Sequence, residues 1–120
     1  MPLVPEDKPN HLLGIADEES IVNTVAFGVD TYDSCNPTRI ARHGTLMVKG
    51  GHIKIKSSKY VDDFQPIDPE TPTIPYTRAY LHHLFKQHEP LFLTLASLHN
   101  LHFMNRMMDD IREKTMRDVI

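Results

Sequence analysis

The sequence predicts an α/β protein with a strand–helix–strand unit, then a β-hairpin, then helices up to the C-terminal end. Three observations predict this order. Short apolar runs flank a helical repeat in the first third, a Gly-Gly pair separates two apolar runs in the middle, and the last third has apolar residues at helical spacing. With 120 residues, the chain is long enough for one modest core.

The first third predicts a βα-type unit after a proline-rich lead-in. Residues 11–15 form a short apolar run that is typical of a buried strand. Asp17 can cap a helix that continues to Ala26, and Gly28 suits its end. Residues 29–32 fit a second strand, so Asp33 is expected at the C-terminal end of that strand.

The middle and the last third predict a hairpin followed by helices. Residues 44–56 read as a β-hairpin with a Gly50-Gly51 turn, and residues 65–77 read as a proline-rich loop. Thr77 can cap a helix that ends near Lys86, and a long helix is expected from Pro90 to about Arg117. Six apolar residues of the long helix are expected near one face: Leu91, Leu95, Leu98, Met104, Met108 and Ile111.

Composition excludes several classes of protein. No apolar run approaches the roughly 20 residues of a membrane helix. Cys35 is the only cysteine, which excludes an internal disulfide and favours a cytoplasmic location. The formal net charge of −3 argues against nucleic-acid binding only if charge is taken as an average.

The charge is uneven along the chain. Residues 34–61 contain six Lys and Arg residues and no Asp or Glu, so the remainder of the chain has a formal charge of −9. Such a basic stretch on an acidic protein is an electrostatic footprint of nucleic-acid binding. The alternative is a solvated hairpin face that happens to be rich in lysine.

Several motifs carry a family resemblance. Residues 28–33 read GVDTYD and residues 36–44 read NPTRIARHG, which resembles the signature of tRNA-guanine transglycosylases, also called queuine tRNA-ribosyltransferases. Further motifs follow in the order found in that family, at residues 5–9, 12–15, 59–64, 66–70, 78–84, 99–100 and 111–112. These enzymes replace the wobble guanine of certain tRNAs with queuine or a precursor base. The chain is identified as resembling their C-terminal part.

The resemblance implies a fold. The family forms a (β/α)8 barrel with an inserted zinc subdomain, and a whole barrel needs about 250 residues. We therefore expect the C-terminal portion of such a barrel, with about two strands, a hairpin subdomain and C-terminal helices. The expected division is residues 1–44 for the last barrel repeats, 45–77 for the hairpin and former zinc subdomain, and 78–120 for the helices.

The resemblance also implies site residues. Asp33 matches the nucleophile that bonds to ribose, a role that suits a reaction in two displacements. Leu13 and Gly14 match the wall against the base. The tRNA anticodon loop would be contacted by Arg39, Arg42, Lys49, Lys54 and Lys56. Without the motif, Asp33 would be interpreted as a turn or cap residue and the arginines as members of surface ion pairs.

The chain departs from the family at the zinc site. The family has three cysteines after the 66–70 motif and a later histidine that matches His99, but residues 71–77 contain no cysteine. A structural zinc needs four ligands, so we expect no zinc and no other cofactor. His99 and His102 could bind a metal weakly, although hydrogen-bonded or solvent-facing histidines are favoured. His82 and His83 are expected on different helix faces, and Cys35 as a small buried residue.

Three functional hypotheses remain open, and whether the chain is an enzyme by itself is left undecided. The chain catalyses base exchange through Asp33, with the acid/base group supplied by another chain. Alternatively, it is a catalytically incomplete fragment or paralogue that acts as a tRNA-binding or dimerisation module. The third hypothesis is a truncated product without a function of its own. A second copy or a longer family member is the expected protein partner, because unpaired barrel edges would expose apolar surface.

Overall fold

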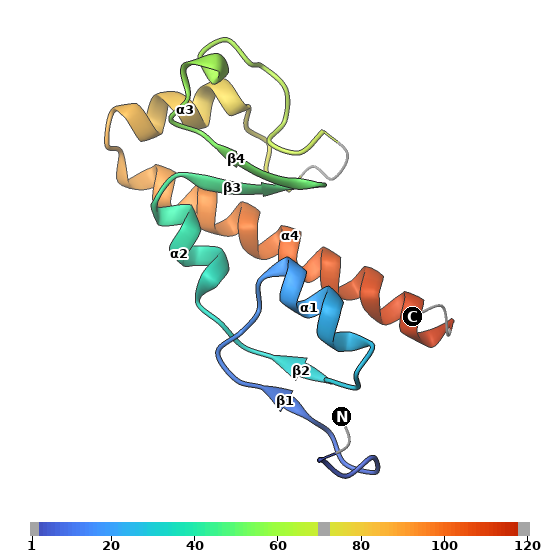
Figure 1. Ribbon diagram of the computed structural model, residues 1–120. Coiled ribbons are helices and arrows are strands. Elements are labelled where there is room, and N and C mark those ends of the chain that lie inside the picture. The colour runs from blue at the N-terminus through green and yellow to red at the C-terminus, as the bar shows by residue number, and fades with distance from the viewer. Residues whose placement is uncertain (1–2, 70–72, 118–120) are drawn as a thin grey trace. The chain divides into compact units, whose positions relative to one another are not determined.

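The computed structural model describes residues 3–69 and 73–117 (Figure 1). The chain divides into two compact units, one made of residues 1–36 with 112–120 and the other of residues 37–111. Within the described residues the strands form two separate two-stranded sheets, and these sheets do not close into a barrel. The protein is therefore of mixed α/β type, as predicted.

The first unit contains the predicted strand–helix–strand segment. Strand β1 (His11–Leu12) pairs in parallel with β2 (Thr31–Tyr32), and helix α1 (Glu18–Val25) connects them. The Asp17 side chain caps α1 by accepting a hydrogen bond of 3.1 Å from the Ser20 amide. This capping satisfies a backbone donor that the first turn of a helix leaves without a partner. The expected cap and the expected order of elements are confirmed.

The expected buried strand at residues 11–15 is wrong in length and in burial. Only His11 and Leu12 are in β1, and the side chains that follow are open to solvent, with Leu13 77% exposed and Ile15 45% exposed. Among the described residues, β1 has a hydrogen-bonded neighbour on one side only. A two-stranded sheet offers few neighbours for the apolar side chains after Leu12 to pack against.

The second unit is built around the predicted hairpin. Strands β3 (Thr45–Val48) and β4 (Gly51–Lys54) are antiparallel, and Val48 pairs with Gly51. The turn is therefore Lys49-Gly50 rather than Gly50-Gly51, and Gly50 has a φ of 88°. A positive φ suits glycine, whereas Gly51 is already part of the ladder. The hairpin is confirmed and the position of its turn is corrected by one residue.

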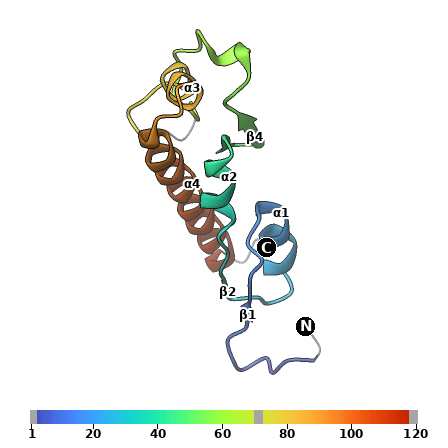
Figure 2. The ribbon, with the colours of Figure 1, turned by 90° about the vertical axis from the view of Figure 1, so that its left-hand side faces the viewer.

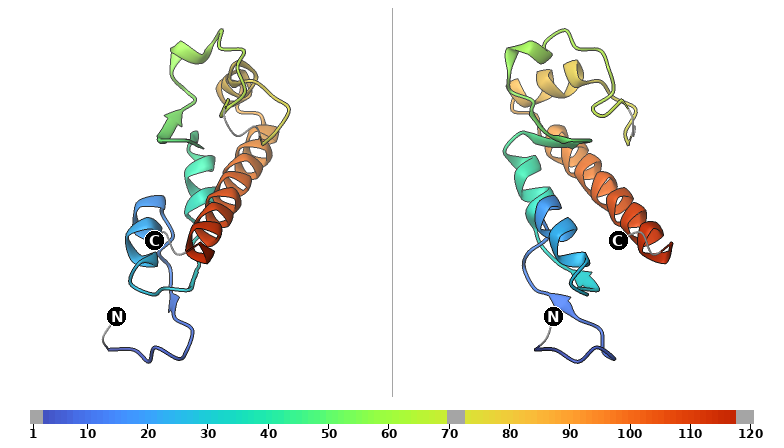
Figure 3. Two further views of the ribbon diagram at one scale, coloured as in Figure 1. Left: turned by 90° about the vertical axis from the view of Figure 1, so that its right-hand side faces the viewer. Right: turned by 45° about the vertical axis from the view of Figure 1, so that its right-hand side comes forward.

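Helices enclose the hairpin in this unit. The hairpin lies between α3 (Arg78–Lys86) and the first half of α4 (Pro90–Met116) (Figures 1 and 3). The Thr77 side chain caps α3 by accepting from the Tyr80 amide at 3.1 Å, as predicted. A short 3-10 helix, η1 (Ser58–Tyr60), follows the hairpin. The core contains Ala41, Leu46, Ile55, Tyr60, Ile67, Leu81, Leu84, Phe92, Leu95 and Ala96.

Helix α2 (Asn36–Arg42) was not expected from the sequence. Its residues from Pro37 onward lie beside α4 in the second unit (Figure 2), where the Asn100 side chain donates to the Pro37 carbonyl at 2.9 Å. The available signal was Ser34, whose hydroxyl accepts from the Asn36 amide at 3.0 Å, followed by a proline in the first turn. Both features are typical of a helix start.

The buried face of α4 is partly polar, which corrects the expected apolar face. Leu91 and Leu98 are 45% and 43% exposed, whereas His99 and Asn100 are completely buried beside the hairpin. The register explains this arrangement, because the N–H and C=O of Met47 point away from β4. Asn100 Oδ1 accepts from the Met47 amide at 2.9 Å, and His99 Nε2 donates to the Met47 carbonyl at 2.6 Å. Side chains of α4 therefore satisfy the open edge of β3.

Candidate active site

Asp33 follows β2 directly and lies in a small polar cluster of the first unit. Its Oδ1 atom accepts a hydrogen bond of 2.8 Å from the Gly14 amide. The same oxygen lies 3.0 Å from Nε2 of His11 on β1. The parallel register aligns His11 with Thr31, two residues before Asp33, so these side chains share one face of the strand pair. The position expected for Asp33, at the end of a strand, is confirmed.

The cluster keeps Asp33 ionised. The Gly14 amide lowers the pKa of the Asp33 carboxyl, and the His11 hydrogen bond lowers this pKa further. The Asp33 side chain is 57% exposed, so it is accessible to a ligand. No described residue donates a hydrogen bond to its second oxygen, Oδ2. The arrangement presents one held oxygen and one free oxygen, which is what an accessible carboxylate nucleophile requires.

Of the two residues predicted to line the base, Gly14 belongs to this cluster and Leu13 does not. Gly14 has a φ of 72°, and its amide is directed at Asp33. Leu13 has an exposed side chain, so it could contact a ligand only as an apolar wall on the surface. His11 is the member of the cluster that was not expected from the sequence. No local signal identified it, because the register that sets His11 opposite Thr31 is not given by the alternation of residues within either strand.

The predicted basic residues are exposed in the second unit. Arg39 and Arg42 lie three residues apart on α2, and Lys49 is in the hairpin turn. Lys54 ends β4, and Lys56 lies two residues further on. Positive side chains on a short helix and a hairpin can contact phosphate oxygens.

The residues around His99 do not fit a zinc ion. Nε2 of His99 is bound to the Met47 carbonyl, and Nδ1 is bound to the Thr73 hydroxyl, so both ring nitrogens are engaged. No group of three or more His, Cys, Asp or Glu residues that could hold a metal occurs in the described part of the chain. Residues 70–72, which directly precede Thr73, lie outside the described residues. Burial lowers the pKa of His99, which favours the neutral ring.

The remaining histidines match the environments predicted for them, whereas Cys35 does not. His99 is hydrogen-bonded and His102 is exposed, which confirms the favoured interpretation of this pair. His82 is buried with Nδ1 2.6 Å from the Ile55 carbonyl, whereas His83 is exposed, as expected for different helix faces. Cys35 is exposed rather than buried, because it lies in the connection between β2 and α2.

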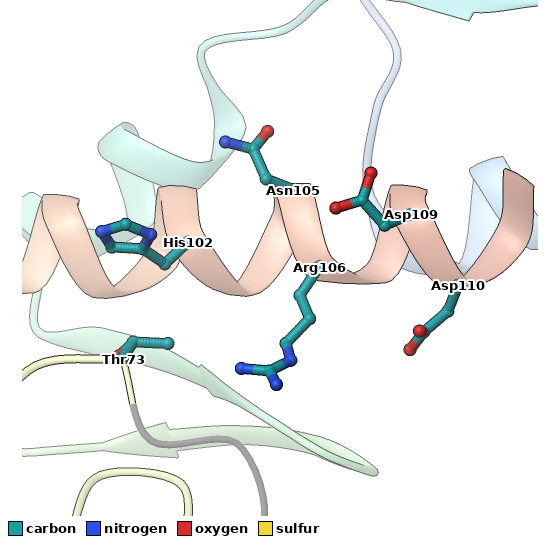
Figure 4. Close-up of a pocket in the computed structure, with 6 residues that line it drawn as sticks. All are labelled: Thr73, His102, Asn105, Arg106, Asp109 and Asp110. Carbon is teal, nitrogen blue, oxygen red and sulfur yellow. The ribbon is translucent and has the colours of Figure 1, made fainter.

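A separate polar hollow of about 460 Å³ lies along the second half of α4 (Figure 4). It is lined by Thr73, His102, Asn105, Arg106, Asp109 and Asp110. Asp33 and the residues predicted to contact the base or tRNA do not line it, whereas His102 does. Its charged side chains carry both signs, so the hollow does not select an anion or a cation by charge alone.

Comparison with known proteins identifies a family. The family model for queuine tRNA-ribosyltransferase matches residues 1–119. A queuine tRNA-ribosyltransferase of Chlamydia abortus is 50% identical over 119 residues, covering 96% of this chain and 32% of the relative. One from Lactococcus lactis subsp. cremoris is 47% identical over 120 residues, covering 98% and 31%. One from Protochlamydia amoebophila is 46% identical over 123 residues, covering 100% and 32%.

The chain spans about a third of the length of these relatives and corresponds to a C-terminal part of them. Among the described residues, no helix is long and apolar enough to cross a membrane.

Proposed function

The chain belongs to the queuine tRNA-ribosyltransferase family, and on that premise we propose that it takes part in base exchange at the wobble position of tRNA. The proposed reaction replaces guanine with queuine or a precursor base. The observation that carries the proposal is Asp33, an exposed and ionised carboxylate with one oxygen held by Gly14 and His11. We further propose that the chain forms the C-terminal portion of a (β/α)8 barrel, divided at residues 44 and 77.

Asp33 would exchange the base in two displacements. In the first, Asp33 attacks C1′ of ribose and the bond from C1′ to the base nitrogen breaks. The electron pair of that bond leaves with guanine, and guanine takes up a proton from water or an acidic group. In the second, a ring nitrogen of the incoming base attacks C1′ and gives up its proton to water or a basic group, while the Asp33 carboxylate leaves with the electron pair of the ester bond. Two inversions at C1′ retain the ribose configuration. The target nucleotide must leave its stack to reach the carboxylate.

The basic residues support contact with tRNA. Arg39, Arg42, Lys49, Lys54 and Lys56 are exposed and belong to the stretch that has no acidic residue. Phosphate contacts of this kind position a nucleic acid without reading its sequence. We propose that these five side chains contact the anticodon loop. Leu13 and Gly14 are proposed to line the site of the base.

A second candidate function is that of a tRNA-binding or dimerisation module without catalysis of its own. The observation that favours it is the length, since the chain spans about a third of its relatives. The exposed apolar side chains in the first unit also suit a protein partner, either a second copy or a longer family member; they include Leu13, Ile15, Val22 and Phe27.

A guanine-exchange assay on cognate tRNA separates the two functions. We expect wild-type chain to incorporate labelled guanine and Asp33→Asn to incorporate none. The control is Asp30→Asn, which removes another exposed carboxylate of the same unit. Absence of exchange in the wild type, together with salt-sensitive tRNA binding, would favour the binding module.

Salt dependence tests the basic surface separately. The logarithm of the tRNA binding constant falls linearly with the logarithm of the salt concentration. Removing one side chain that binds a phosphate makes this slope less steep by about one. We expect Arg39→Glu and Lys54→Glu to weaken tRNA binding and flatten this slope. Lys86→Glu, at the end of α3, is the charge-matched control. Equal slopes for all variants would rule out the proposed phosphate contacts.

A further inference from the structure

We propose that His11 is a positioning residue that holds Oδ1 of Asp33, so that Oδ2 is the oxygen that attacks ribose. This inference rests on the proposed function and deepens it, because it divides the roles of the two carboxylate oxygens. Both hydrogen bonds from described residues converge on Oδ1, from the Gly14 amide at 2.8 Å and from His11 Nε2 at 3.0 Å. Oδ2 accepts none from the described residues.

The backbone fixes this arrangement. The register of β1 and β2 sets His11 opposite Thr31, and Nδ1 of His11 lies 2.7 Å from the Thr31 hydroxyl oxygen. The imidazole ring is therefore held at both nitrogens, with Thr31 on one side and Asp33 on the other. A ring held at two points restricts rotation of the carboxylate that it contacts. The Gly14 amide adds a third point that belongs to the main chain.

The proton positions follow from the chemistry of the groups. Asp33 is ionised and can only accept, so Nε2 of His11 carries the hydrogen between them. When the ring is neutral, Nδ1 accepts from the Thr31 hydroxyl, and when the ring is protonated, Nδ1 donates to the oxygen of that hydroxyl. Because a hydroxyl can both donate and accept, Thr31 supports either charge state. The hydrogen bond to Oδ1 is therefore compatible with either charge state of the ring.

The two oxygens of Asp33 then differ in chemical character. Two donors withdraw electron density from Oδ1, while the lone pairs of Oδ2 remain available to attack C1′. In the second displacement the same donors stabilise the charge that returns to the departing carboxylate. His11 acts on the reaction only through Asp33, which makes it a positioning group rather than a catalytic residue.

NMR titration of the Asp33 carboxyl carbon tests the contact without tRNA. His11→Leu removes the side-chain donor and is expected to raise the pKa of Asp33 part of the way to its ordinary value, since Gly14 still donates. His11→Gln retains an amide donor and is expected to recover part of the shift. His83→Leu removes an exposed histidine from α3 and is expected to have no effect. An unchanged Asp33 titration in His11→Leu would overturn the inference.

The rate of formation of the Asp33–ribose adduct tests the positioning role. We expect His11→Leu to form the adduct about tenfold more slowly with unchanged tRNA affinity, and His11→Gln to be intermediate. An adduct rate equal to wild type would refute positioning even if the titration shifts. If wild-type chain forms no adduct, the proposed function fails, and the titration alone decides whether His11 holds Asp33.

Discussion

Asn100 offers the sharpest test of how the second unit is held together. Its side chain is completely buried and makes three hydrogen bonds to main-chain groups. Oδ1 accepts from the Met47 amide at 2.9 Å, and Nδ2 donates to the carbonyls of Pro37 at 2.9 Å and Thr45 at 3.1 Å. One side chain on α4 therefore connects that helix to α2 and to the outer edge of β3.

The cost of Asn100→Ala follows from these three partners. A buried main-chain group left without a partner costs about 1–3 kcal/mol. Three such groups would cost about 3–9 kcal/mol together, and the better helix propensity of alanine returns about 0.6 kcal/mol, so the net loss is about 2–8 kcal/mol. Stabilities of single domains are about 5–15 kcal/mol, so the variant would lose a large part of its stability.

Urea unfolding followed by far-UV circular dichroism measures this loss. With a slope of about 1–3 kcal/mol per M, even the smallest expected loss of about 2 kcal/mol lowers the unfolding midpoint of Asn100→Ala by about 1 M. Asn105→Ala, on the exposed side of the same helix, is the matched control and should be neutral or slightly more stable. A loss below about 1 kcal/mol for Asn100→Ala would refute the reasoning that its hydrogen bonds join the hairpin to α4.

Three further predictions concern single residues. Burial lowers the pKa of His99, so the unfolded chain binds a proton at higher pH than the native chain does. The free energy of unfolding should therefore fall as pH decreases through about 6.5. His99→Gln should reduce this pH dependence. Gly44→Ala should lower the free energy of unfolding by about 1–3 kcal/mol, because Gly44 has a φ of +85° and an added Cβ would lie 3.0 Å from the Phe85 ring. Gly50→Ala should lower it by about 1 kcal/mol, because an added Cβ at Gly50 would lie in open space. Thr77→Ala should cost about 1 kcal/mol by removing the cap of α3.

Each of these predictions has a contrary outcome in the same kind of unfolding experiment. Wild-type stability that stays flat from about pH 7.5 to about pH 5.5 would contradict the buried neutral state of His99. Equal losses for Gly44→Ala and Gly50→Ala would show that the Phe85 ring moves aside at no cost. A Thr77→Ala variant as stable as wild type would mean that solvent replaces the cap.

The correct predictions depend on interactions between residues that are close in sequence. The cap at Thr77 and the hairpin at residues 45–54 involve partners only a few positions apart, so turn and cap residues indicate them. Asp33 was expected at the end of a strand for the same reason. The turn was misplaced by one residue because two adjacent glycines both permit positive φ, and only the strand register separates them.

The wrong predictions depend on partners that are distant in sequence. The exposed face of α4 includes Leu98, although leucine spacing predicts that it is buried. His99 and Asn100 take the buried face because the edge of β3, more than 50 residues earlier, offers main-chain groups that need partners. Leu13 is exposed because burial of a strand depends on its neighbours and not on the hydrophobicity of its own residues.

Motifs, caps and turns are local and carry their own signals, so the residues alone indicate the family, the order of elements and the candidate nucleophile. The contact of His11 and Gly14 with one oxygen of Asp33 could be seen only in the folded chain, because β1 and β2 must pair before residues about 20 positions apart can meet. The tertiary structure also decided that His99 binds the main chain of the hairpin, because an edge strand exposes donors and acceptors that buried side chains must satisfy.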